Sequence, residues 1–453
     1  MADYAPQVPS IQFPSWPCSL LIMTASFMQP KPTKIRPADV LNVFLLTGMF
    51  LLPFWPDKGT LRASVVEAPA GRQTAKREPL AVVRFELYHN RILVPIEVNE
   101  SSVPAVFIID TGASMSVLAD VQAKALGIEL KDKGDTKNAG NGEGSIHLSL
   151  AKNMRFRLGG ADVFARSVGV VPLQSWERFE GRTIAGILGA DLFKKYVVEV
   201  DYDNQTLTLF EPSSFVFSEQ AKTVPLKLLG GSIPVIDATL EGLKESSLKA
   251  HLAIDTGTYS ALRLNRPFTE EHKVLASVPK LVPSLGFGVE GDFREALGRL
   301  QGLRLGTVSM ENVLTSFSQS SRGQTTTKAY DGSMGGELLR HFRVTLDYSR
   351  KLVILQPGSD FEKVDQADMS GAVLAASVPD FSSISVHRVF EGTPAAESGL
   401  QEGDLLLAID NRSATEIGLE KIRELFSREG LYVLKVKRGD QEMELRLSTR
   451  KLI

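Results

Sequence analysis

One short block of sequence occurs twice in this chain, and its neighbours repeat with it. Phe-Ile-Ile-Asp-Thr-Gly at Phe107–Gly112 recurs as Leu-Ala-Ile-Asp-Thr-Gly at Leu252–Gly257, an offset of 145 residues. Further blocks recur at an offset of 146 residues: Gly140–Gly142 with Gly286–Gly288, Gly186–Phe193 with Gly332–Leu339, and Val197–Tyr202 with Arg343–Tyr348. Blocks that hold one register in this way indicate a duplicated structural unit. The sequence therefore predicts two homologous lobes, residues 81–212 and 222–357.

Both lobes have the pattern of β-structure. Short apolar or alternating runs are bounded by Gly, Asn and Asp, which is typical of strands joined by turns. The expected strands are Ile92–Val98, Ala105–Ile109, Val197–Tyr202 and Thr206–Phe210 in the first lobe, and Ile233–Leu240, Val344–Tyr348 and Leu352–Leu355 in the second. Helices are expected to be few, with one over Val117–Leu126 that ends at Gly127.

The repeated aspartates carry the chemistry. A carboxylate at the end of a buried strand is costly unless it is used. If Asp110 and Asp255 meet across a pseudo-twofold axis, they cannot both ionise readily, so one retains its proton and the pair titrates as a unit. The ionised aspartate can then take a proton from a water while the protonated one polarises a substrate carbonyl.

These motifs resemble those of the aspartic proteases of the pepsin and retropepsin clan. Asp110–Ser114 and Asp255–Ser260 look like the two active-site loops, and Ile187–Gly189 and Ser333–Gly335 look like the elements that brace them. The resemblance implies a mainly β fold with two pseudo-twofold-related acid-protease β-barrel lobes, and a catalytic dyad of Asp110 and Asp255. The residues that it implies as support for the loops are Thr111, Gly112, Ala113, Ser114, Gly189, Thr256, Gly257, Thr258 and Gly335.

Two glycine-rich segments fall where this family has flaps, the hairpins that close over substrate. Their glycines are Gly140, Gly142 and Gly144 in the first lobe and Gly286, Gly288 and Gly291 in the second. Ala113 stands where pepsins usually have a hydroxyl residue, and the only cysteine, Cys18, excludes a disulfide within the chain. These departures favour a fused, retropepsin-like enzyme over a digestive pepsin. Because Thr258 offers a hydroxyl donor and Ala113 does not, Asp255 is expected to ionise before Asp110.

A different motif lies near the C-terminus. Gly392–Asp404 reads Gly-Thr-Pro-Ala-Ala-Glu-Ser-Gly-Leu-Gln-Glu-Gly-Asp and precedes an apolar run, and this closely resembles bacterial PDZ domains. The domain is expected over residues 371–450, after a linker at 358–370. The resemblance implies that it binds an extended peptide C-terminus by strand addition, with backbone amides holding the carboxylate. The residues expected at that loop are Ser370, Gly371, Ala372 and Val373. A purely structural PDZ domain that stabilises the protease is the alternative.

The N-terminal region has a different composition. Residues 1–37 are rich in proline and are interpreted as unstructured, or as an over-called start of the chain. An apolar run at 40–55, within a segment at 38–56, follows three basic residues and suits a secretory signal or a membrane anchor. A polar tether at 57–80 follows. We therefore expect export to the periplasm or the cell envelope; a buried apolar segment of a folded domain is the alternative.

Composition limits the partners. The formal net charge is −2, so no basic field exists to hold a nucleic acid. With one cysteine and six scattered histidines, no metal site is expected, and a mechanism in which water is the nucleophile needs no cofactor. We predict an aspartic endopeptidase whose partners are protein or peptide substrates and a C-terminal peptide ligand of the PDZ domain. The rivals are a non-catalytic duplicated β scaffold with a peptide-binding PDZ domain, and a swapped dimer whose lobes pair between chains.

Overall fold

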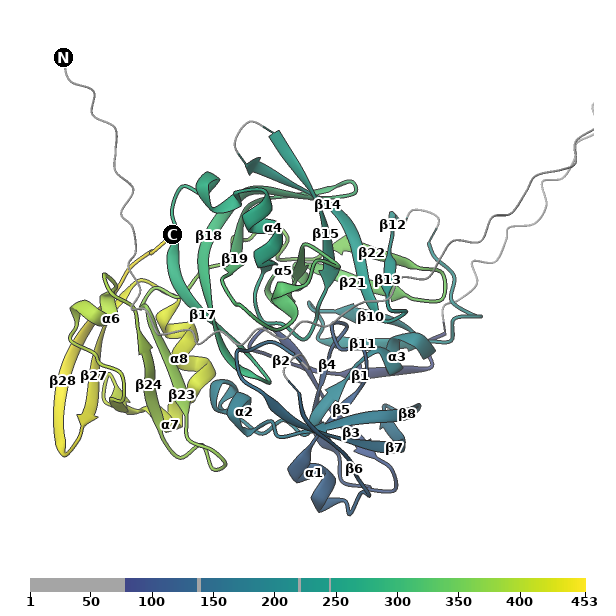
Figure 1. Cartoon of the computed structure of the whole chain (residues 1–453), viewed down its shortest axis with the longest axis horizontal. Helices are drawn as coiled ribbons and strands as arrows, with labels where there is room; N and C mark the ends of the chain where they lie inside the picture. The colour runs from purple at the N-terminus through teal and green to yellow at the C-terminus, as the bar shows by residue number, and fades with distance from the viewer. Residues whose placement is uncertain (1–77, 137–139, 219–220, 244–245) are drawn as a thin grey trace, which may run out of the picture. The chain divides into compact units, whose positions relative to one another are not determined.

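The computed structural model describes residues 78–136, 140–218, 221–243 and 246–453. The predicted N-terminal segments at 1–37 and 38–56, and the tether up to residue 77, lie outside the described residues. In the part of the chain that is described, no helix is both long enough and apolar enough to span a membrane. Strands dominate this part, as Figure 1 shows, and the mainly β fold class that was predicted is confirmed.

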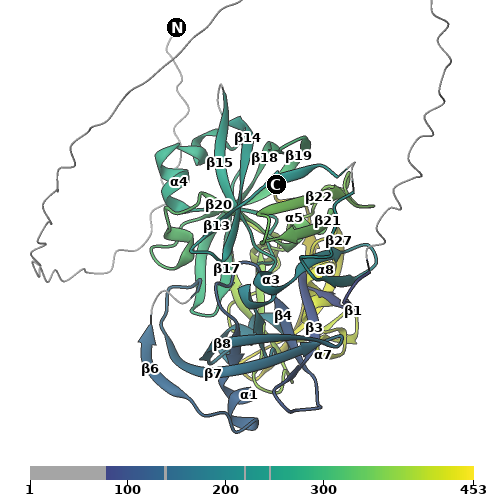
Figure 2. The same ribbon diagram turned by 90° about the vertical axis from the view of Figure 1, so that its right-hand side faces the viewer.

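Each lobe contains one eight-stranded sheet. The strands in the first lobe are β2 (Glu86–Tyr88), β3 (Arg91–Val98), β4 (Ala105–Ile109), β5 (Val117–Ala119), β6 (Lys131–Thr136), β7 (Ile146–Leu158), β8 (Ala161–Val171) and β9 (Gly186–Leu188). Those in the second lobe are β13 (Lys227–Leu229), β14 (Ile233–Leu243), β15 (Ser246–Ile254), β16 (Leu262–Leu264), β17 (Val282–Gly288), β18 (Gly291–Leu305), β19 (Val308–Ser318) and β20 (Gly332–Met334). Figure 2 shows both sheets.

The two sheets have equivalent strand orders. The first is β2-β3-β4-β9-β5-β8-β7-β6 and the second is β13-β14-β15-β20-β16-β19-β18-β17. The directions agree as well: β4 and β9 run parallel, as do β15 and β20, whereas β5–β9 and β16–β20 are antiparallel. The strand that precedes each repeated aspartate, β4 or β15, therefore occupies the same place in both sheets.

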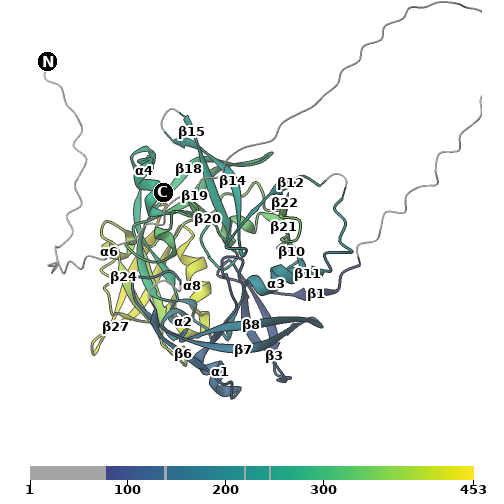
Figure 3. The same ribbon diagram turned by 45° about the vertical axis from the view of Figure 1, so that its right-hand side comes forward.

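A third sheet is built by both lobes. Its strands are β1 (Ala81–Arg84), β10 (Val197–Asp201), β11 (Thr206–Phe210), β12 (Thr223–Pro225), β21 (Phe342–Asp347) and β22 (Leu352–Pro357). Their order is β1-β11-β10-β21-β22-β12, so the lobes join where β10 pairs antiparallel with β21 (Figure 3). The hairpin turns match, because Asp201 accepts a hydrogen bond from the amide of Asn204 and Asp347 accepts one from the amide of Arg350, each at 3.0 Å.

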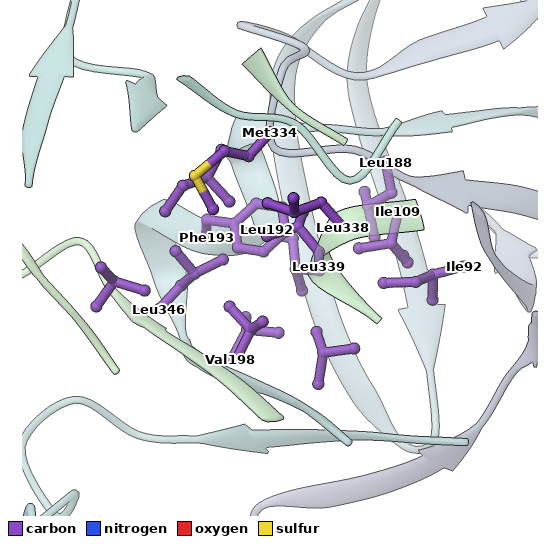
Figure 4. Close-up of a cluster of buried hydrophobic side chains, with 14 of the residues drawn as sticks. Ile92, Ile109, Leu188, Leu192, Phe193, Val198, Met334, Leu338, Leu339 and Leu346 are labelled. Carbon is purple, nitrogen blue, oxygen red and sulfur yellow. The ribbon is translucent and has the colours of Figure 1, made fainter. Parts of the chain in front are cut away.

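A common core lies between this sheet and the ends of β9 and β20. Two short helices supply much of it, α3 (Ala190–Lys195) and α5 (Gly336–Leu339). Figure 4 shows their apolar side chains packed together with those of the flanking strands, from both lobes. The residues labelled there are Ile92, Ile109, Leu188, Leu192, Phe193, Val198, Met334, Leu338, Leu339 and Leu346, all of them buried. This core holds both aspartate-bearing strands on a single support.

The helix expected over Val117–Leu126 is partly wrong. Its first residues form β5, because Val117 and Leu118 pair with both β8 and β9, and only Asp120–Ala125 is helical, as α1. Gly127 ends this helix with a positive φ of 62°, as expected. Two further helices, α2 (Gln174–Glu180) and α4 (Arg266–Glu271), and two 3₁₀ turns at Val274–Ser277 and Gln324–Thr326 were not predicted.

The C-terminal part forms its own sheet around a separate apolar core. Its strands are β23 (Ala372–Ala376), β24 (Ile384–Val389), β25 (Leu405–Ile409), β26 (Arg412–Ser413), β27 (Gly430–Arg438) and β28 (Gln441–Thr449). The order is β23-β24-β25-β27-β28, with β26 beside β25. Three helices belong to it, α6 (Pro394–Glu397), α7 (Ala414–Ile417) and α8 (Leu419–Phe426). In the Gly392–Asp404 motif, Pro394 begins α6 and Gly399, at φ 82°, follows its end.

The shared core makes a stability prediction. Phe193 is 1% exposed and stacks on Tyr348 of the other lobe with ring centroids 5.6 Å apart. Phe193→Ala should lower the free energy of unfolding by about 3–5 kcal/mol. The matched control Phe164→Ala, at a ring that is 64% exposed, should change it by less than about 0.5 kcal/mol. Urea denaturation followed by circular dichroism measures both; equal effects would contradict the assignment of Phe193 to a shared core.

Candidate active site

Asp110 and Asp255 each follow the central strand of their lobe directly. The amide of Asp110 donates to the carbonyl of Leu188 at 3.0 Å, and the amide of Asp255 donates to that of Met334 at 2.9 Å. These acceptors lie on β9 and β20, the parallel neighbours of β4 and β15. The braces that the sequence suggested thus hold the two aspartates at the ends of their strands in the same way.

The two threonines of the repeated motif connect the loops. Thr111 Oγ1 donates to the carbonyl of Ile254 at 2.6 Å, and Thr256 Oγ1 donates to that of Ile109 at 2.8 Å. Each hydroxyl oxygen also accepts the backbone N–H of the other threonine, at 3.1 and 3.0 Å. Both side chains are buried. Each lobe therefore satisfies the buried polar groups of the other, and the pairing is reciprocal about the pseudo-twofold axis.

The glycines of the motif permit the close approach of the two carboxyls. A Cβ placed on Gly257 would lie 2.1 Å from Cγ of Asp110, and one on Gly112 would lie 2.6 Å from Oδ1 of Asp255. In addition, the amide of Gly112 donates to Oδ1 of Asp110 at 2.7 Å, and that of Gly257 donates to Oδ1 of Asp255 at 3.1 Å. Any side chain at either glycine would occupy the space of the opposite aspartate.

The remaining residues predicted to support the loops differ in their surroundings. Gly189 and Gly335 lie against the backbone of the loops, since an added Cβ would be 2.7 Å from the carbonyl oxygen of Ala113 or 2.1 Å from that of Ser260. Ser114 is exposed and lines the cavity above the aspartates. Thr258 is buried, but its Oγ1 accepts a hydrogen bond from Arg263 at 2.8 Å.

The electrostatics of the pair are asymmetric. Burial, and then the charge of Asp255, raises the pKa of Asp110 to about 8. Burial also raises the pKa of Asp255, but Arg263 and a hydrogen bond from Asp110 oppose the rise. Of the two carboxyls, Asp110 is therefore the one that retains a shared proton, and Asp255 is the one that ionises first. The expected order of ionisation agrees, but the cation of Arg263 replaces the hydroxyl of Thr258 as its physical cause.

Two buried arginines were missed in the sequence. Arg91 donates from Nε to the carbonyl of Gly257 at 2.6 Å and from Nη1 to Glu180 at 2.8 Å, which ties the second active-site loop to α2. Although burial opposes the effect, Arg91 and His89 lower the pKa of Glu180 to about 2. Arg263 donates from Nε to Glu295 at 2.5 Å. Arg263 stands inside an apolar Leu-Arg-Leu strand, a signal that sequence analysis could have used.

The predicted flap segments meet at their tips. In the second lobe, β17 and β18 form a hairpin that turns at Val289 and Glu290. In the first, the connection between β6 and β7 includes Gly140–Gly144, and residues 137–139 lie outside the description. The amide of Glu290 donates to the carbonyl of Asn141 at 3.0 Å, and the amide of Gly144 donates to the carbonyl of Glu290 at 2.9 Å. A Cβ on Gly142 or Gly288 would lie 2.2 Å from the backbone of the opposite tip, which explains glycine at both positions.

Both aspartates line a cavity of about 430 Å³. Residues from both flap segments also line it, among them Asn141 and Phe287, together with Trp176 from α2. Its walls mix apolar side chains with the carboxyls, as expected for a site that accepts a peptide. Within the described residues, no group of three or more His, Cys, Asp or Glu side chains is arranged to hold a metal ion.

The predicted carboxylate loop of the C-terminal domain needs a correction. The amides of Ser370 and Gly371 donate to Oδ1 of Asp368 at 3.0 and 2.6 Å, and the amide of Ala372 donates to Ser370 Oγ at 3.0 Å. Val373 continues into β23. The side-chain carboxylate of Asp368 therefore already holds the amides of Ser370 and Gly371, and the Ser370 hydroxyl holds that of Ala372, so they do not offer a free anion site for a peptide.

Comparisons with known proteins agree with both resemblances. Residues 94–192 match the family model described as aspartyl protease, and residues 386–438 match that of the PDZ domain. The chain thus carries an aspartyl protease-like region in its first lobe and a PDZ domain near its C-terminus. An aspartic proteinase from Irpex lacteus is a similar solved structure, with 14% identity and a TM-score of 0.39, covering 62% of this chain and 98% of that chain. No curated protein matches the chain.

The close approach at Gly257 can be tested without an activity assay. Gly257→Ala should lower the free energy of unfolding by about 1–3 kcal/mol, because the new methyl group must displace Asp110 or its loop. Gly169→Ala is a matched control, since an added Cβ there meets its nearest neighbour at an ordinary 3.6 Å. Thermal unfolding compares the two; an unchanged melting temperature in Gly257→Ala would contradict the described contact.

Proposed function

We propose that this protein is an aspartic endopeptidase that hydrolyses peptide bonds with a water activated between Asp110 and Asp255. The observation that carries the proposal is a pair of half-buried carboxyls, one from each repeated loop, that interact electrostatically and line a cavity under two flap tips. The protease-like match of the first lobe supports the same reading. Protein or peptide substrates, bound in an extended form, fit a cavity between two lobes.

The proposed reaction assigns a different role to each aspartate. Asp255, ionised beside Arg263, takes a proton from the water as the water oxygen attacks the scissile carbonyl carbon. Asp110, protonated, donates its proton to the carbonyl oxygen, so the tetrahedral intermediate is a neutral diol. Asp255 then gives its proton to the leaving amine nitrogen as the C–N bond breaks, and Asp110 recovers a proton from the diol. The dyad returns to its starting state with one proton.

We also propose that the PDZ domain recognises the C-terminus of a substrate or partner. The support is the edge strand β23, since PDZ domains bind extended peptides by adding a strand to a sheet edge.

The dyad is tested by single substitutions. Asp110→Asn and Asp255→Asn should each lower kcat/KM by at least about a hundredfold, because each removes one proton-transfer group. The two losses should not add in the double variant, since the pair acts as a unit. Digestion of a random peptide library, read by mass spectrometry, measures cleavage, with Asp237→Asn as a control at an exposed aspartate. Full cleavage by either dyad variant would contradict the dyad, whereas no cleavage by the wild type would favour the non-catalytic scaffold.

The asymmetry predicts the pH profile. Activity needs Asp110 protonated, so it falls as the pH rises through the pKa of Asp110, about 8. Activity also needs Asp255 ionised, so it falls as the pH drops through the pKa of Asp255, which burial raises above its ordinary value. The double variant Arg263→Met/Glu295→Gln removes the cation and its partner together, and should move the acid limb of kcat/KM to higher pH. The surface pair variant Arg157→Met/Asp162→Asn should leave both limbs in place; an unmoved acid limb in the first variant would contradict the role of Arg263.

A further inference from the structure

The strand-addition site of the PDZ domain is already in contact with another part of the chain. β23 is one of the two end strands in the order of the domain's sheet, and α8 packs beside it. The helix α2 of the first lobe packs against β23 (Figure 1). At the end of α2, Arg423 on α8 donates from Nη2 to the carbonyl of Phe179, and Leu419 lies against Gly181. The amide of His89, also in the first lobe, donates to Glu420 at 2.8 Å.

α2 itself is anchored in the first lobe. Glu180 forms a buried ion pair with Arg91 at 2.8 Å, and its carbonyl accepts a hydrogen bond from the hydroxyl of Tyr88 at 2.5 Å. Glu177 accepts the amide of Ile184 at 2.8 Å. A competitor for the PDZ surface would therefore separate the PDZ domain from α2, and leave α2 with the lobe.

The docked PDZ domain also contacts the second-lobe flap. His387 on β24 contacts Asp292 at 2.9 Å between Nε2 and Oδ2, and Asp292 is the second residue of β18 after the flap turn. Phe179 stacks on Phe287 of β17 with ring centroids 4.0 Å apart, and the His387 ring lies edge-on to Phe179 at 5.0 Å. The PDZ domain and α2 thus hold the flap hairpin from outside the cavity, while its tip is bonded to the first-lobe flap.

We propose that the PDZ domain is a clamp on the second-lobe flap, with α2 as its internal ligand, and that an extended peptide with a free C-terminus releases the clamp by competing with α2 for the site between β23 and α8. The expected effect of release on cleavage depends on the proposed protease function, whereas the release of the flap itself does not depend on it.

The chemistry of the groove favours a carboxylate over the internal ligand. In the closed arrangement Arg423 binds the neutral backbone carbonyl of Phe179, and its Nη1 lies 3.6 Å from Glu420. A peptide carboxylate adds a charge–charge attraction that the carbonyl lacks, and it can accept two parallel hydrogen bonds from one guanidinium. A peptide with a free C-terminus therefore forms a charge-assisted contact with Arg423 that α2 cannot form. A peptide with an amidated C-terminus lacks this contact as well.

Hydrogen exchange on the full chain tests the clamp without any need for activity. The probe is a pool of ten-residue peptides with four randomised C-terminal positions and free carboxylates, and the control is the same pool amidated. The free pool should speed the amide exchange of residues 282–305 by about fivefold, because the local opening of the flap becomes easier. The amidated pool should leave it unchanged. Binding of the free pool with unchanged flap exchange would overturn the proposal.

Two variants make the test independent of the peptide. Asp292→Asn weakens the contact with His387 and should speed flap exchange in the absence of peptide, whereas Asp237→Asn, which changes a similar exposed contact with His251 at 2.7 Å, should not. If the pool binds Asp292→Asn but not the wild type, the result supports the clamp, because it means that the intact clamp outcompetes weakly binding peptides. If it binds neither protein, the proposal is wrong.

Cleavage assays distinguish a failure of the clamp from a failure of the proposed protease function. With an amidated substrate that cannot occupy the PDZ site, the free pool should raise kcat/KM in parallel with flap exchange. Faster amide exchange of the flap in a protein that cleaves no peptide would contradict the proposed protease function but support the proposed clamp. If cleavage requires Asp110 and Asp255, but the free pool changes neither kcat/KM nor the amide exchange of the flap, the protease function is supported and the clamp is contradicted.

Discussion

Two threonine hydroxyls hold this structure together at the point where its chemistry is proposed. Thr111 and Thr256 each donate to a carbonyl of the other lobe and accept an amide from it, in a place that water does not reach. Neither lobe can satisfy these groups alone, because each donor needs the acceptor that the other supplies. The common core beneath them and the sheet that both lobes build follow from that requirement, since they must deliver two strand ends to one axis.

Symmetry at the axis does not extend to the charges around it. Arg263 lies beside Asp255 and pairs with Glu295 of its own lobe, whereas Arg91 comes from the first lobe to bind the second-lobe loop at Gly257. In a symmetric pair, a shared proton would have equal affinity for both carboxyls, and the two aspartates would be interchangeable. The unequal placement of two cations gives the aspartates different proton affinities, which is what separate acid and base roles require.

The features that could be predicted from the sequence are those that occur in both copies of the repeat. Both aspartates, their glycines, the bracing strands and the flap glycines appear twice, so each copy supports the interpretation of the other. Arg91 and α2 occur once and have no counterpart at the repeat offset. The partners of the arginines are 89 and 32 residues away, a distance at which local pattern carries no information. Helix α2 left a weaker signal, with apolar Leu173, Trp176 and Phe179 at a spacing of three before Gly181. The prediction for the loop at Ser370 overlooked a local signal instead: Asp368 stands two residues earlier and takes the amides of Ser370 and Gly371 in an Asx-type turn.

The two flap tips are bonded to each other through their backbones, Asn141 to Glu290 and Glu290 to Gly144. In the proposed endopeptidase, a cover built in this way would admit an extended chain between the two lobes and keep out whole folded domains. For a protein substrate, the segment to be cut must first leave its own fold. The selectivity of such an enzyme would then be governed by the local unfolding equilibrium of its targets as much as by their side chains, and stable proteins would survive beside it while damaged or unassembled ones would not.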